Sequence, residues 1–534
     1  MPRLTSNSTL ILFIVTFLFS PFIQSEVFTA TDDIEKLIYS EYELYHELDN
    51  YIKLQQNRLV TLRKLLDEIK SQMHGVHLKG YEQGKHPLAV FLLVRRFLRN
   101  WKELEATAEE EQIFNDKLLD TFAYYKRTFP NLQDLEGSAE AILRLQDVYN
   151  LKEIDLASGI IDGGPRLGVQ LSWLDCFTIG KKAYENEDFE RSYKWMKIVQ
   201  RSQNPSISSD QWVKILDYLA FSAYKLGNVK EAMNLTQALL KLDPKHERAK
   251  QNIYYYEKVL TKNSDGKEGE DSLSQDENDW SHEFDFYKKL CRGGPKVKAG
   301  DNKMVSNHLT CYQLRQHARL LFSPINVEVI SLQPYILIYH NLLNDLEVEA
   351  LKTLAAPMLQ RATVHNKDTG KLEYATYRIS KSAWLNDDDH PLVRRISTLI
   401  EDVTGLTMES AEALQIANYG IGGHYEPHFD HADVRSGTDV FKTWKGGNRI
   451  ATMLIYLSSV ELGGATVFSS AGVRIEPRQG SAAFWYNLHR NGNGNNLTRH
   501  AACPVLIGSK WIANKWIHQV GQELRHQCTL NSND

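Results

Sequence analysis

The chain has 534 residues, which exceeds the size of one hydrophobic core and predicts three or four domains. Its formal net charge is −5, with 24% charged and 42% apolar residues, so the composition excludes a strongly basic nucleic-acid-binding protein. After the N-terminus no stretch approaches the roughly eighteen apolar residues of a membrane span, and we expect a soluble mature protein.

Residues 1–25 have the composition of a cleaved secretory signal peptide. Arg3 precedes an apolar run at residues 10–19, and Ser25 supplies a small residue after it. The run is shorter than a comfortable membrane span. The C-terminal residues 529–534 contain no lumenal retention tetrapeptide. We therefore predict entry into the secretory pathway. A resident of the endoplasmic reticulum lumen would be retained there through a partner.

Five cysteines follow, namely Cys176, Cys291, Cys311, Cys503 and Cys528. In an oxidising lumen we expect disulfides, and proximity alone favours pairing Cys291 with Cys311 and Cys503 with Cys528. These bridges would close loops of about twenty and twenty-five residues, lengths at which a disulfide contributes a few kcal/mol. Four cysteines allow three connectivities, so the pairing stays open. Cys176 is left over, and we expect a buried free thiol.

Residues 38–73 carry apolar side chains at alternating spacings of three and four. Nine of the eleven seam positions are apolar, which is a heptad pattern. The strict period favours a helix that pairs with another chain, although an amphipathic helix of a bundle is the alternative. Further helical patterns cover residues 87–129 and 131–149. We interpret residues 26–150 as a helical, coiled-coil assembly domain.

Residues 151–260 contain a helix-pair repeat with an offset of 40 residues, because the segment 180–192 aligns with 220–232. Tyr184 then superimposes on Tyr224. The second copy continues into an Asp-Pro pair that is typical of the end of a tetratricopeptide repeat. Two such pairs with flanking helices predict a small concave solenoid fragment.

Aromatic side chains crowd this repeat segment. Tyr218, Phe221 and Tyr224 recur every three residues on one expected helix, and Tyr184 occupies the matching place in the first copy. Repeat helices bury aromatic residues routinely, so packing explains the pattern. A groove for an extended proline-rich peptide explains it equally well, because polyproline II ligands dock on aromatic surfaces. Both interpretations stay open.

The composition changes between residues 261 and 283 to Lys, Asn, Ser, Asp, Gly and Glu. Seven acidic residues lie between Asp265 and Asp279, with hardly any apolar ones. This pattern predicts a flexible linker that repels itself. Everything from residue 284 to residue 534 is assigned to the last domain.

That last domain alternates short β-rich runs with glycine and asparagine turns. Many short strands separated in this way predict a β-sandwich or jelly roll. One helix is expected near residues 345–359. The expected strands are residues 334–339, 414–419, 449–457, 465–468, 481–486 and 510–517. The chain as a whole is therefore expected to be a multidomain α + β protein.

His428 and Asp430 lie two residues apart, so both side chains point to one face of an extended strand. A third histidine would complete a set of two histidines and one carboxylate, which leaves three positions open and suits non-haem Fe(II). His424 precedes His428 by four residues, but Pro427 and nearby glycines oppose the helix that a zinc-protease pair requires. We expect His424 and His431 to be incidental.

Two histidines further along the chain could supply the third ligand. His489 lies in a loop rich in Gly and Asn, whereas His500 opens an apolar run that predicts a strand. We therefore select His500. Lys510 starts a later strand, where lysines are usually solvated. If Lys510 points inward it needs an anion, and the distal carboxylate of 2-oxoglutarate, whose other end chelates iron, supplies one.

Four segments resemble the catalytic domain of animal collagen prolyl 4-hydroxylase alpha subunits. They are residues 419–430, 463–468, 498–506 and 510–518. The resemblance extends over essentially the whole mature chain, since the order of the helical, tetratricopeptide-like, linker and oxygenase segments also agrees. It implies a double-stranded β-helix, or jelly roll, for the oxygenase domain.

The resemblance also implies a role for each matching residue. The iron ligands would be His428, Asp430 and His500. Lys510 would bind the C5 carboxylate of 2-oxoglutarate, with Tyr419 and Thr466 as hydrogen-bonding neighbours. A lysyl hydroxylase relative would carry an arginine in place of Lys510. The residues near the peptidyl proline would be Tyr425, Arg449, Trp516 and His518.

The implied reaction hydroxylates C4 of proline in X-Pro-Gly sequences of collagen-like chains. It consumes 2-oxoglutarate and O2 and yields succinate and CO2, while ascorbate restores oxidised iron. The resemblance further implies a tetramer of two alpha chains with two protein disulfide isomerase chains. Two other functions stay open, namely a secreted peptide-binding scaffold with an inactive oxygenase fold and a zinc hydrolase with the same ligands. Asn234 and Asn496 match the glycosylation pattern.

Overall fold

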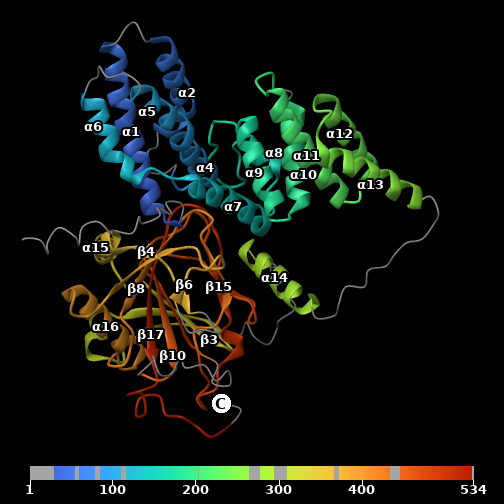
Figure 1. Ribbon diagram of the computed structural model, residues 1–534. Helices are drawn as coiled ribbons and strands as arrows, with labels where there is room; N and C mark the ends of the chain where they lie inside the picture. The colour runs from blue at the N-terminus through green and yellow to red at the C-terminus, as the bar shows by residue number, and fades with distance from the viewer. Residues whose placement is uncertain are drawn as a thin grey trace, which may run out of the picture.

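A computed structural model describes nine stretches of the chain, shown as ribbons in Figure 1. They are residues 29–54, 59–77, 84–109, 116–202, 204–263, 277–293, 310–365, 372–432 and 446–531. Helices of the first half lie above a β-rich second part, so the expected order of helical and β-rich regions is confirmed. The predicted signal peptide lies outside the described residues. Within the nine stretches, no helix is both long enough and apolar enough to cross a membrane.

The N-terminal helices surround α4, all of whose residues are buried. A helix that is apolar on every side belongs in a core, and α4 is the centre of this one. Its Arg96 is charged, and the Nη2 atom donates a 2.9 Å hydrogen bond to Glu41 Oε2 of α1. The helices are α1 (Thr31–Leu54), α2 (Leu59–His77), α4 (Pro87–Arg96), η3 (Phe97–Trp101), α5 (Lys102–Glu109), α6 (Asp116–Tyr125), η4 (Lys126–Thr128), α7 (Leu132–Tyr149) and α8 (Glu153–Ala157).

The heptad pattern is divided between α1 and α2, which pack against each other (Figure 1). Leu44 and Leu48 of α1 lie in the same buried cluster as Leu66 and Ile69 of α2. The polar seam residue Glu41 is buried because it pairs with Arg96. In the described residues two helices carry the pattern in place of one, and their buried seam positions pack within the chain. Pairing of this region with another chain stays a prediction.

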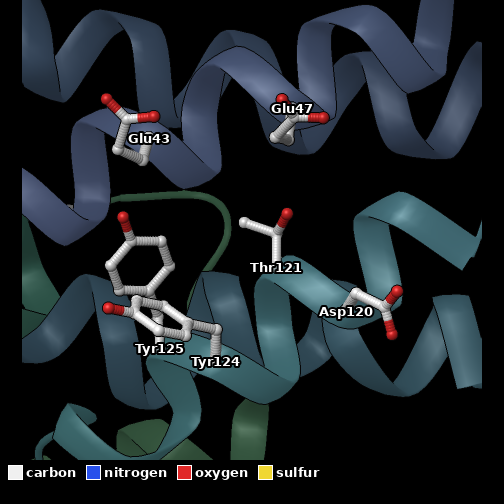
Figure 2. Close-up of a pocket in the computed structure, with 6 residues that line it drawn as sticks. All are labelled: Glu43, Glu47, Asp120, Thr121, Tyr124 and Tyr125. Carbon is white, nitrogen blue, oxygen red and sulfur yellow. The ribbon is translucent and has the colours of Figure 1, made fainter.

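A surface pocket lies between α1 and α6 (Figure 2). Glu43 and Glu47 line it from α1, and Asp120, Tyr124 and Tyr125 line it from α6. It belongs to the helical region and shares no lining residue with the pocket of the β-rich part.

The repeat segment forms five helices. They follow one another along the chain from α9 to α13 in Figure 1. The two predicted pairs are α9 with α10 and α11 with α12. Each pair begins with the same capping box, in which Ser172 or Ser208 accepts a hydrogen bond from the backbone three residues on. The helices are α9 (Trp173–Glu185), α10 (Phe189–Ser202), α11 (Ser209–Lys225), α12 (Val229–Leu242) and α13 (Glu247–Asn263).

The expected linker at residues 261–283 is helical at both ends. α13 continues to Asn263, and α14 (Glu277–Cys291) begins well before residue 283. The helix α14 is stable in this place because Tyr287 and Leu290 are buried in a cluster with residues of the β-rich part. The intervening residues 264–276 lie outside the described part of the chain.

The β-rich part holds a nine-stranded sheet in the order β1-β2-β3-β14-β10-β17-β8-β7-β4 and a four-stranded sheet in the order β13-β12-β15-β9. All strand pairings are antiparallel. The strands are β1 (Cys311–Leu314), β2 (Ile325–Leu332), β3 (Tyr335–His340), β4 (Gln360–Arg361), β5 (Val364–His365), β6 (Leu372–Glu373), β7 (Lys381–Leu385), β8 (Leu414–Tyr419), β9 (Tyr425–His428), β10 (Arg449–Tyr456), β11 (Leu462–Gly463), β12 (Thr466–Phe468), β13 (Val473–Ile475), β14 (Ala482–Tyr486), β15 (His500–Ala502), β16 (Val505–Ile507) and β17 (Lys510–His518).

All six expected strands are present, as β3, β8, β10, β12, β14 and β17, and the expected helix is α15 (Asp345–Ala355). The helix α16 (Pro391–Thr404) was not predicted. Its buried residues Val393, Ile396, Ile400 and Val403 follow the spacing of an amphipathic helix that packs on the sheet. The two sheets line one pocket between them, while the jelly-roll winding itself stays a prediction.

The helical region is docked on the β-rich part through polar and close contacts. Arg144 Nη1 of α7 donates to Gly422 O at 2.9 Å, and Tyr149 Oη donates to Pro504 O at 2.6 Å. A Cβ atom at Gly422 would lie 2.7 Å from Ala141 Cβ, so α7 sits directly on this loop. The loop that joins β8 to β9 is therefore shaped by the N-terminal helices.

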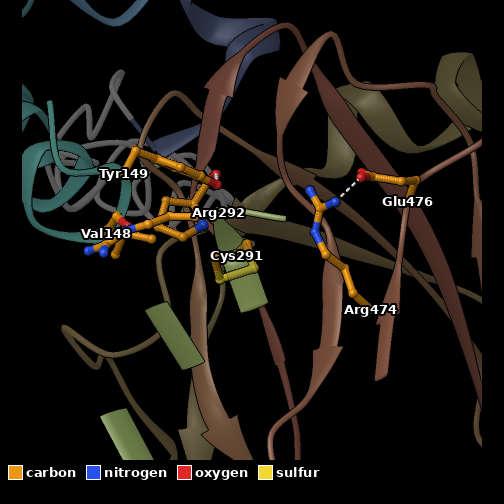
Figure 3. The surroundings of a disulfide bond; sticks show 8 residues. Val148, Tyr149, Cys291, Arg292, Arg474 and Glu476 are labelled. Carbon is orange, nitrogen blue, oxygen red and sulfur yellow. Dashed lines mark hydrogen bonds and ion pairs between the residues drawn. A yellow bond between two sulfur atoms is a disulfide. The ribbon is translucent and has the colours of Figure 1, made fainter. Parts of the chain in front are cut away.

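The disulfide joins Cys291, the last residue of α14, to Cys503 beyond β15, with a Cα–Cα distance of 5.6 Å (Figure 3). The predicted pairs Cys291–Cys311 and Cys503–Cys528 were therefore wrong. Proximity in the sequence gave the wrong partners because α14 brings Cys291 next to Cys503, which is 212 residues away in the sequence. Cys311 and Cys528 are exposed free cysteines, and Cys176 is the expected buried thiol.

Candidate metal centre and co-substrate pocket

The pairing of β9 with β15 brings the two predicted histidine ligands together. His500 lies opposite His428 in the antiparallel register, and the ring centroids are 4.4 Å apart. Asp430 follows β9, with Oδ1 3.8 Å from His428 Nε2 and Oδ2 3.6 Å from His500 Nε2. One ligand atom from each of the three residues lies within 4.8 Å of the others. The three side chains therefore converge on one point.

Backbone carbonyl groups fix the orientation of both histidine rings. His428 Nδ1 lies 2.8 Å from Glu426 O, and His500 Nδ1 lies 2.9 Å from Thr498 O. A carbonyl oxygen only accepts, so each Nδ1 carries the hydrogen and each Nε2 presents a lone pair towards Asp430. Both rings have the tautomer and direction that metal ligation requires.

Asp430 is held by a hydrogen-bonded chain from the large sheet. Thr452 Oγ1 of β10 donates to Asp430 Oδ2 at 2.7 Å, and Asn487 Nδ2 donates to Thr452 Oγ1 at 2.8 Å. Burial raises the pKa of Asp430, but the adjacent His500 and His428 lower it more, to about 2. The carboxylate is therefore ionised at neutral pH.

The charge state of His428 also suits a metal. Burial lowers the pKa of His428 to about 3, and the neighbouring His500 adds to this effect. A neutral imidazole with a free Nε2 lone pair binds a cation without first losing a proton. Two imidazole nitrogens and one carboxylate would occupy one face of a bound metal ion and leave its other coordination positions open. This set of residues therefore fits Fe(II).

The same pocket contains the predicted co-substrate residues Lys510, Tyr419 and Thr466. Lys510 Nζ lies 5.2 Å from the centroid of the Tyr419 ring. Thr466 Oγ1 accepts a 2.9 Å hydrogen bond from Tyr456 Oη, which leaves the hydroxyl hydrogen of Thr466 available for another acceptor. The structure thus places all three near the metal ligands.

Lys510 is only 1% exposed, yet among the described residues no carboxylate pairs with its ammonium group. Burial lowers the pKa of Lys510 to about 7, and the distant Glu476 offsets this only partly. A buried ammonium group without a counter-ion costs several kcal/mol. The pocket therefore offers a strong site for an anion.

The residues predicted near the peptidyl proline surround the metal ligands on one side. The Tyr425 ring stacks on His428 with a centroid distance of 3.5 Å. The guanidinium carbon of Arg449 lies 4.0 Å from the centroid of the Trp516 ring, and Arg449 Nη1 donates to Asp430 O at 3.4 Å. Tyr425 and Trp516 line the pocket itself, whereas Arg449 and His518 are not among its lining residues.

Glu412 organises this side of the site and was not predicted. Arg449 Nη2 donates to Glu412 Oε2 at 3.0 Å, and His518 Nε2 lies 3.0 Å from Glu412 Oε1. Burial raises the pKa of Glu412, but His518 and Arg449 lower it below its usual value. The carboxylate stays charged and holds the Arg449 and His518 side chains in place beside the metal ligands.

Arg378 was also missed, although it lines the pocket. Its guanidinium carbon lies 4.9 Å from the Tyr425 ring centroid, and Nη2 donates to Gln415 Oε1 at 3.1 Å. No local motif marks Arg378. The pocket residue Asn514 could have been found, because every second residue of β17 from Lys510 onwards faces the pocket.

The other histidines of the segment do not join the metal set. His424 is buried in the loop before β9, with Nε2 3.9 Å from Glu426 Oε1. His431 lies beside Phe429, with ring centroids 4.9 Å apart. His489 is exposed in the turn after β14. Among the described residues, the only cluster with metal-ligand geometry is the predicted one.

The four predicted groove residues lie in a continuous row on α9 and α11. The centroid of the Tyr184 ring is 4.8 Å from that of Tyr218 and 5.6 Å from that of Phe221, and Tyr224 follows at 6.2 Å from Phe221. Arg248 of α13 lies over Phe221 and donates to Tyr184 Oη at 2.6 Å. All four rings are half-buried, so each packs on its neighbours and keeps part of its surface exposed.

A pocket between two antiparallel sheets that holds this ligand set and a buried lysine has the composition of an iron oxygenase site. The model of the 2OG-Fe(II) oxygenase superfamily matches residues 414–518, which include the metal set and Lys510. The β-rich part is therefore a 2-oxoglutarate- and Fe(II)-dependent oxygenase domain.

The rest of the chain defines the family more narrowly. The model of the prolyl 4-hydroxylase alpha-subunit N-terminal region matches residues 30–163, and that of the prolyl 4-hydroxylase peptide-substrate-binding domain matches residues 174–262. The chain is 41% identical over 517 residues to prolyl 4-hydroxylase subunit alpha-2 of Caenorhabditis elegans, covering 95% of this chain and 94% of that one. The human subunit alpha-1 is 38% identical over 516 residues, with 94% and 96% covered. The chain belongs to the prolyl 4-hydroxylase alpha-subunit family.

A solved structure from Paramecium Bursaria Chlorella virus-1, the viral collagen prolyl hydroxylase in complex with 2OG, is 24% identical. It covers 35% of this chain and 96% of its own length, with a TM-score of 0.28.

We predict that Thr452→Val weakens metal binding by about 10- to 100-fold, because supporting hydrogen bonds orient a ligating carboxylate. The change keeps the shape of the side chain but removes the donor to Asp430 Oδ2. Thr452→Ser keeps the hydroxyl group and should bind as the wild type does. Anaerobic titration with Fe(II) measures both affinities, and equal affinity of Thr452→Val and wild type would contradict the assigned support.

Proposed function

We propose that the chain is the catalytic alpha subunit of a procollagen-proline 4-dioxygenase, which hydroxylates C4 of proline in X-Pro-Gly sequences of collagen-like polypeptides. The observation that carries this proposal is one pocket that contains both the His428, Asp430 and His500 set and the buried Lys510. The metal set alone also fits a zinc hydrolase. A buried lysine in the same pocket, with no carboxylate partner among the described residues, favours a carboxylate co-substrate, and 2-oxoglutarate is that co-substrate in this superfamily.

Iron would be held by His428 Nε2, His500 Nε2 and the Asp430 carboxylate. Bound Fe(II) supplies oxygen activation coupled to the decarboxylation of 2-oxoglutarate to succinate and CO2. Lys510 would bind the C5 carboxylate of 2-oxoglutarate. Thr466 would donate its free hydroxyl hydrogen to the same group, because its oxygen already accepts from another side chain. Tyr419 would support both from β8.

The peptidyl proline would lie on the side of the pocket formed by Tyr425 and Trp516, whose rings provide an apolar surface for the pyrrolidine ring. Arg449 and His518 would stay in place there because Glu412 binds both. A dry and rigid surface around the target carbon excludes water and limits side reactions.

The row of Tyr184, Tyr218, Phe221 and Tyr224 would bind a proline-rich segment of the substrate chain. The rings are half-buried and contact one another edge to face or at a tilt, so little side-chain entropy remains to be lost on binding. A polyproline II helix is preformed as well, which makes an aromatic row a suitable surface for it. The peptide-binding interpretation thus agrees with the packing of the row and does not replace it.

We further propose that the protein resides in the endoplasmic reticulum lumen, uses ascorbate to restore oxidised iron, and assembles with protein disulfide isomerase as two alpha and two beta chains. Its membership of the alpha-subunit family supports this environment. Asn234 and Asn496, which match the glycosylation pattern, are both exposed, on α12 and in η9 (Asn496–Thr498).

The proposal predicts that 2-oxoglutarate decarboxylation depends on proline-containing peptide and on all three ligands. We expect His428→Ala, Asp430→Ala or His500→Ala to lose hydroxylation completely while the chain still folds, because each removes one metal bond. His489→Ala, which alters an exposed histidine, is the matched control and should retain activity.

Metal analysis together with succinate release separates the competing functions. An inactive scaffold would bind peptide and release no succinate. A zinc hydrolase would contain zinc and cleave its substrate without 2-oxoglutarate. Full hydroxylation by any one of the three ligand variants would contradict the assigned metal centre.

The pKa of Lys510 predicts how the affinity for 2-oxoglutarate depends on pH. Since this pKa is lowered to about 7, the ammonium form that binds a carboxylate dominates below pH 7 and is lost above it. Binding above pH 7 must take up one proton, so Kd should rise by up to about tenfold for each pH unit. Calorimetric titration between pH 6 and pH 9 measures this slope.

Lys510→Arg is the matched control, because its guanidinium stays charged over the whole range. Its Kd should therefore not follow this slope. If Lys510→Arg and the wild type show the same pH dependence, another group is responsible.

The aromatic row predicts that Tyr224→Ala in the full chain raises the Kd of a proline-rich peptide by about 10-fold or more, because a contacting aromatic residue contributes about 1–3 kcal/mol. Tyr254→Ala is the matched control, since Tyr254 lies on α13 outside the row and is 71% exposed. Unchanged peptide affinity of Tyr224→Ala would leave packing as the only role of the row.

A further inference from the structure

The turn between β16 and β17 is attached to the N-terminal helical region at two consecutive residues, and the next residue, Lys510, is bonded to Asn418 of β8. Gly508 N donates to Lys85 O at 2.9 Å. Ser509 Oγ lies 2.6 Å from Thr31 Oγ1, at the first residue of α1. Lys510 O accepts a 3.5 Å hydrogen bond from Asn418 Nδ2. The backbone that precedes the Lys510 side chain is therefore bound to a distant part of the sequence.

Thr31 lies at the centre of these contacts. Asn418 Nδ2 donates to Thr31 Oγ1 at 2.9 Å, and Asp32 N donates to Asn418 Oδ1 at 3.3 Å. Thr31 and Asn418 are both 0% exposed, so their hydrogen bonds are sheltered from water. A buried polar group that loses its partner costs about 1–3 kcal/mol. The network is consequently a firm attachment and not a surface contact.

Strand alternation connects this network to the pocket. Asn418 precedes Tyr419 on β8. Tyr419 lies opposite Lys510 of β17 in the antiparallel register. Successive side chains of a strand point to opposite faces, so Asn418 faces α1 while Tyr419 faces the pocket. Thr31 thus binds, on the sheet face opposite the pocket, the residues that precede Lys510 and Tyr419 in the chain.

We propose that Thr31 is a positioning residue for the co-substrate, through which the helical N-terminal region sets the affinity of the oxygenase domain for 2-oxoglutarate. It fixes the backbone of Lys510 by way of Ser509 and Asn418, and it touches neither metal nor substrate. This inference rests on the proposed role of Lys510 as the partner of the C5 carboxylate.

A positioning role of Thr31 differs from general stabilisation in which kinetic and binding constants change when its hydroxyl group is removed. Removing the Thr31 hydroxyl group removes one hydrogen bond each from Ser509 and Asn418, which neighbour Lys510, but leaves the contacts of the metal ligands unchanged. The affinity for 2-oxoglutarate should fall, whereas kcat at saturating 2-oxoglutarate and KM for the peptide should stay as in the wild type. A merely structural role would change all three quantities together.

The test is calorimetric binding of 2-oxoglutarate to the full chain with Fe(II) in the absence of oxygen. We expect Thr31→Val to raise Kd by about 10-fold, the lower end of the range of about 10- to 100-fold for supporting residues of a binding site. Thr31→Ser keeps the hydroxyl group and should restore Kd to within about twofold of wild type. Steady-state assays of the same variants supply kcat and both KM values.

Tyr149→Phe is the matched control for loss of a contact between the two regions. It removes another hydrogen bond from the helices to the β-rich part, the one to Pro504 O, and should leave the Kd for 2-oxoglutarate unchanged. Should Thr31→Val fail to fold, Ser509→Ala carries the test, with the same direction of effect expected. Unchanged Kd in the folded variant, or an equal rise in Tyr149→Phe, would overturn the inference.

Lys510→Ala separates this inference from the proposed function. If Lys510→Ala binds 2-oxoglutarate as tightly as the wild type, the proposed role of Lys510 fails, and the inference fails with it. If Lys510→Ala loses binding while Thr31→Val binds normally, the proposed function stands and only the positioning role of Thr31 is wrong.

Discussion

The antiparallel register between β9 and β15 is the interaction on which the metal centre depends. It sets His500 opposite His428, although their positions in the sequence are far apart. A shift by one residue would turn one imidazole to the other face of the sheet, because side chains alternate along a strand. Each ring is then oriented by a carbonyl of its own chain segment, while Asp430 is held from the other sheet by Thr452. The centre therefore exists only when both sheets are formed and aligned.

The helical region contributes to the same site from outside. The loop between Tyr419 and His428 contacts α7 at Gly422. Gly422 has a φ of +72°, and its contact with Ala141 leaves no space for a side chain. At this point a glycine satisfies both the backbone conformation and the close approach. Since this loop connects Tyr419 of the pocket with His428 of the metal set, the N-terminal helices and the β-rich part form one structural unit around the pocket.

Local patterns in the sequence predicted what depends on neighbouring residues. Alternation found β8 and β17, and a spacing of two residues found His428 and Asp430. Features that depend on the choice among distant partners were not found. The heptad pattern did not show that it is divided between two helices that pack together, and the partner of Cys291 is close in space and distant in sequence. Glu412 was not found for the same reason, because its importance comes from Arg449 and His518, which only the fold brings to it.

Two buried lysines of β17 differ in whether the described part of the protein supplies a counter-ion. Lys515 and Lys510 are both buried, with 2% and 1% of their surfaces exposed, and they lie on opposite faces of the strand. Lys515 is paired with Asp387 at 3.5 Å, so its charge is compensated within the protein. Lys510 faces Tyr419 and the metal ligands, and none of the described residues offers it a carboxylate. A carboxylate paired with Lys510 would remove the cost of burying its ammonium group but would also repel an anion. The buried Lys510, without a counter-ion among the described residues, therefore favours an anion beside the metal set.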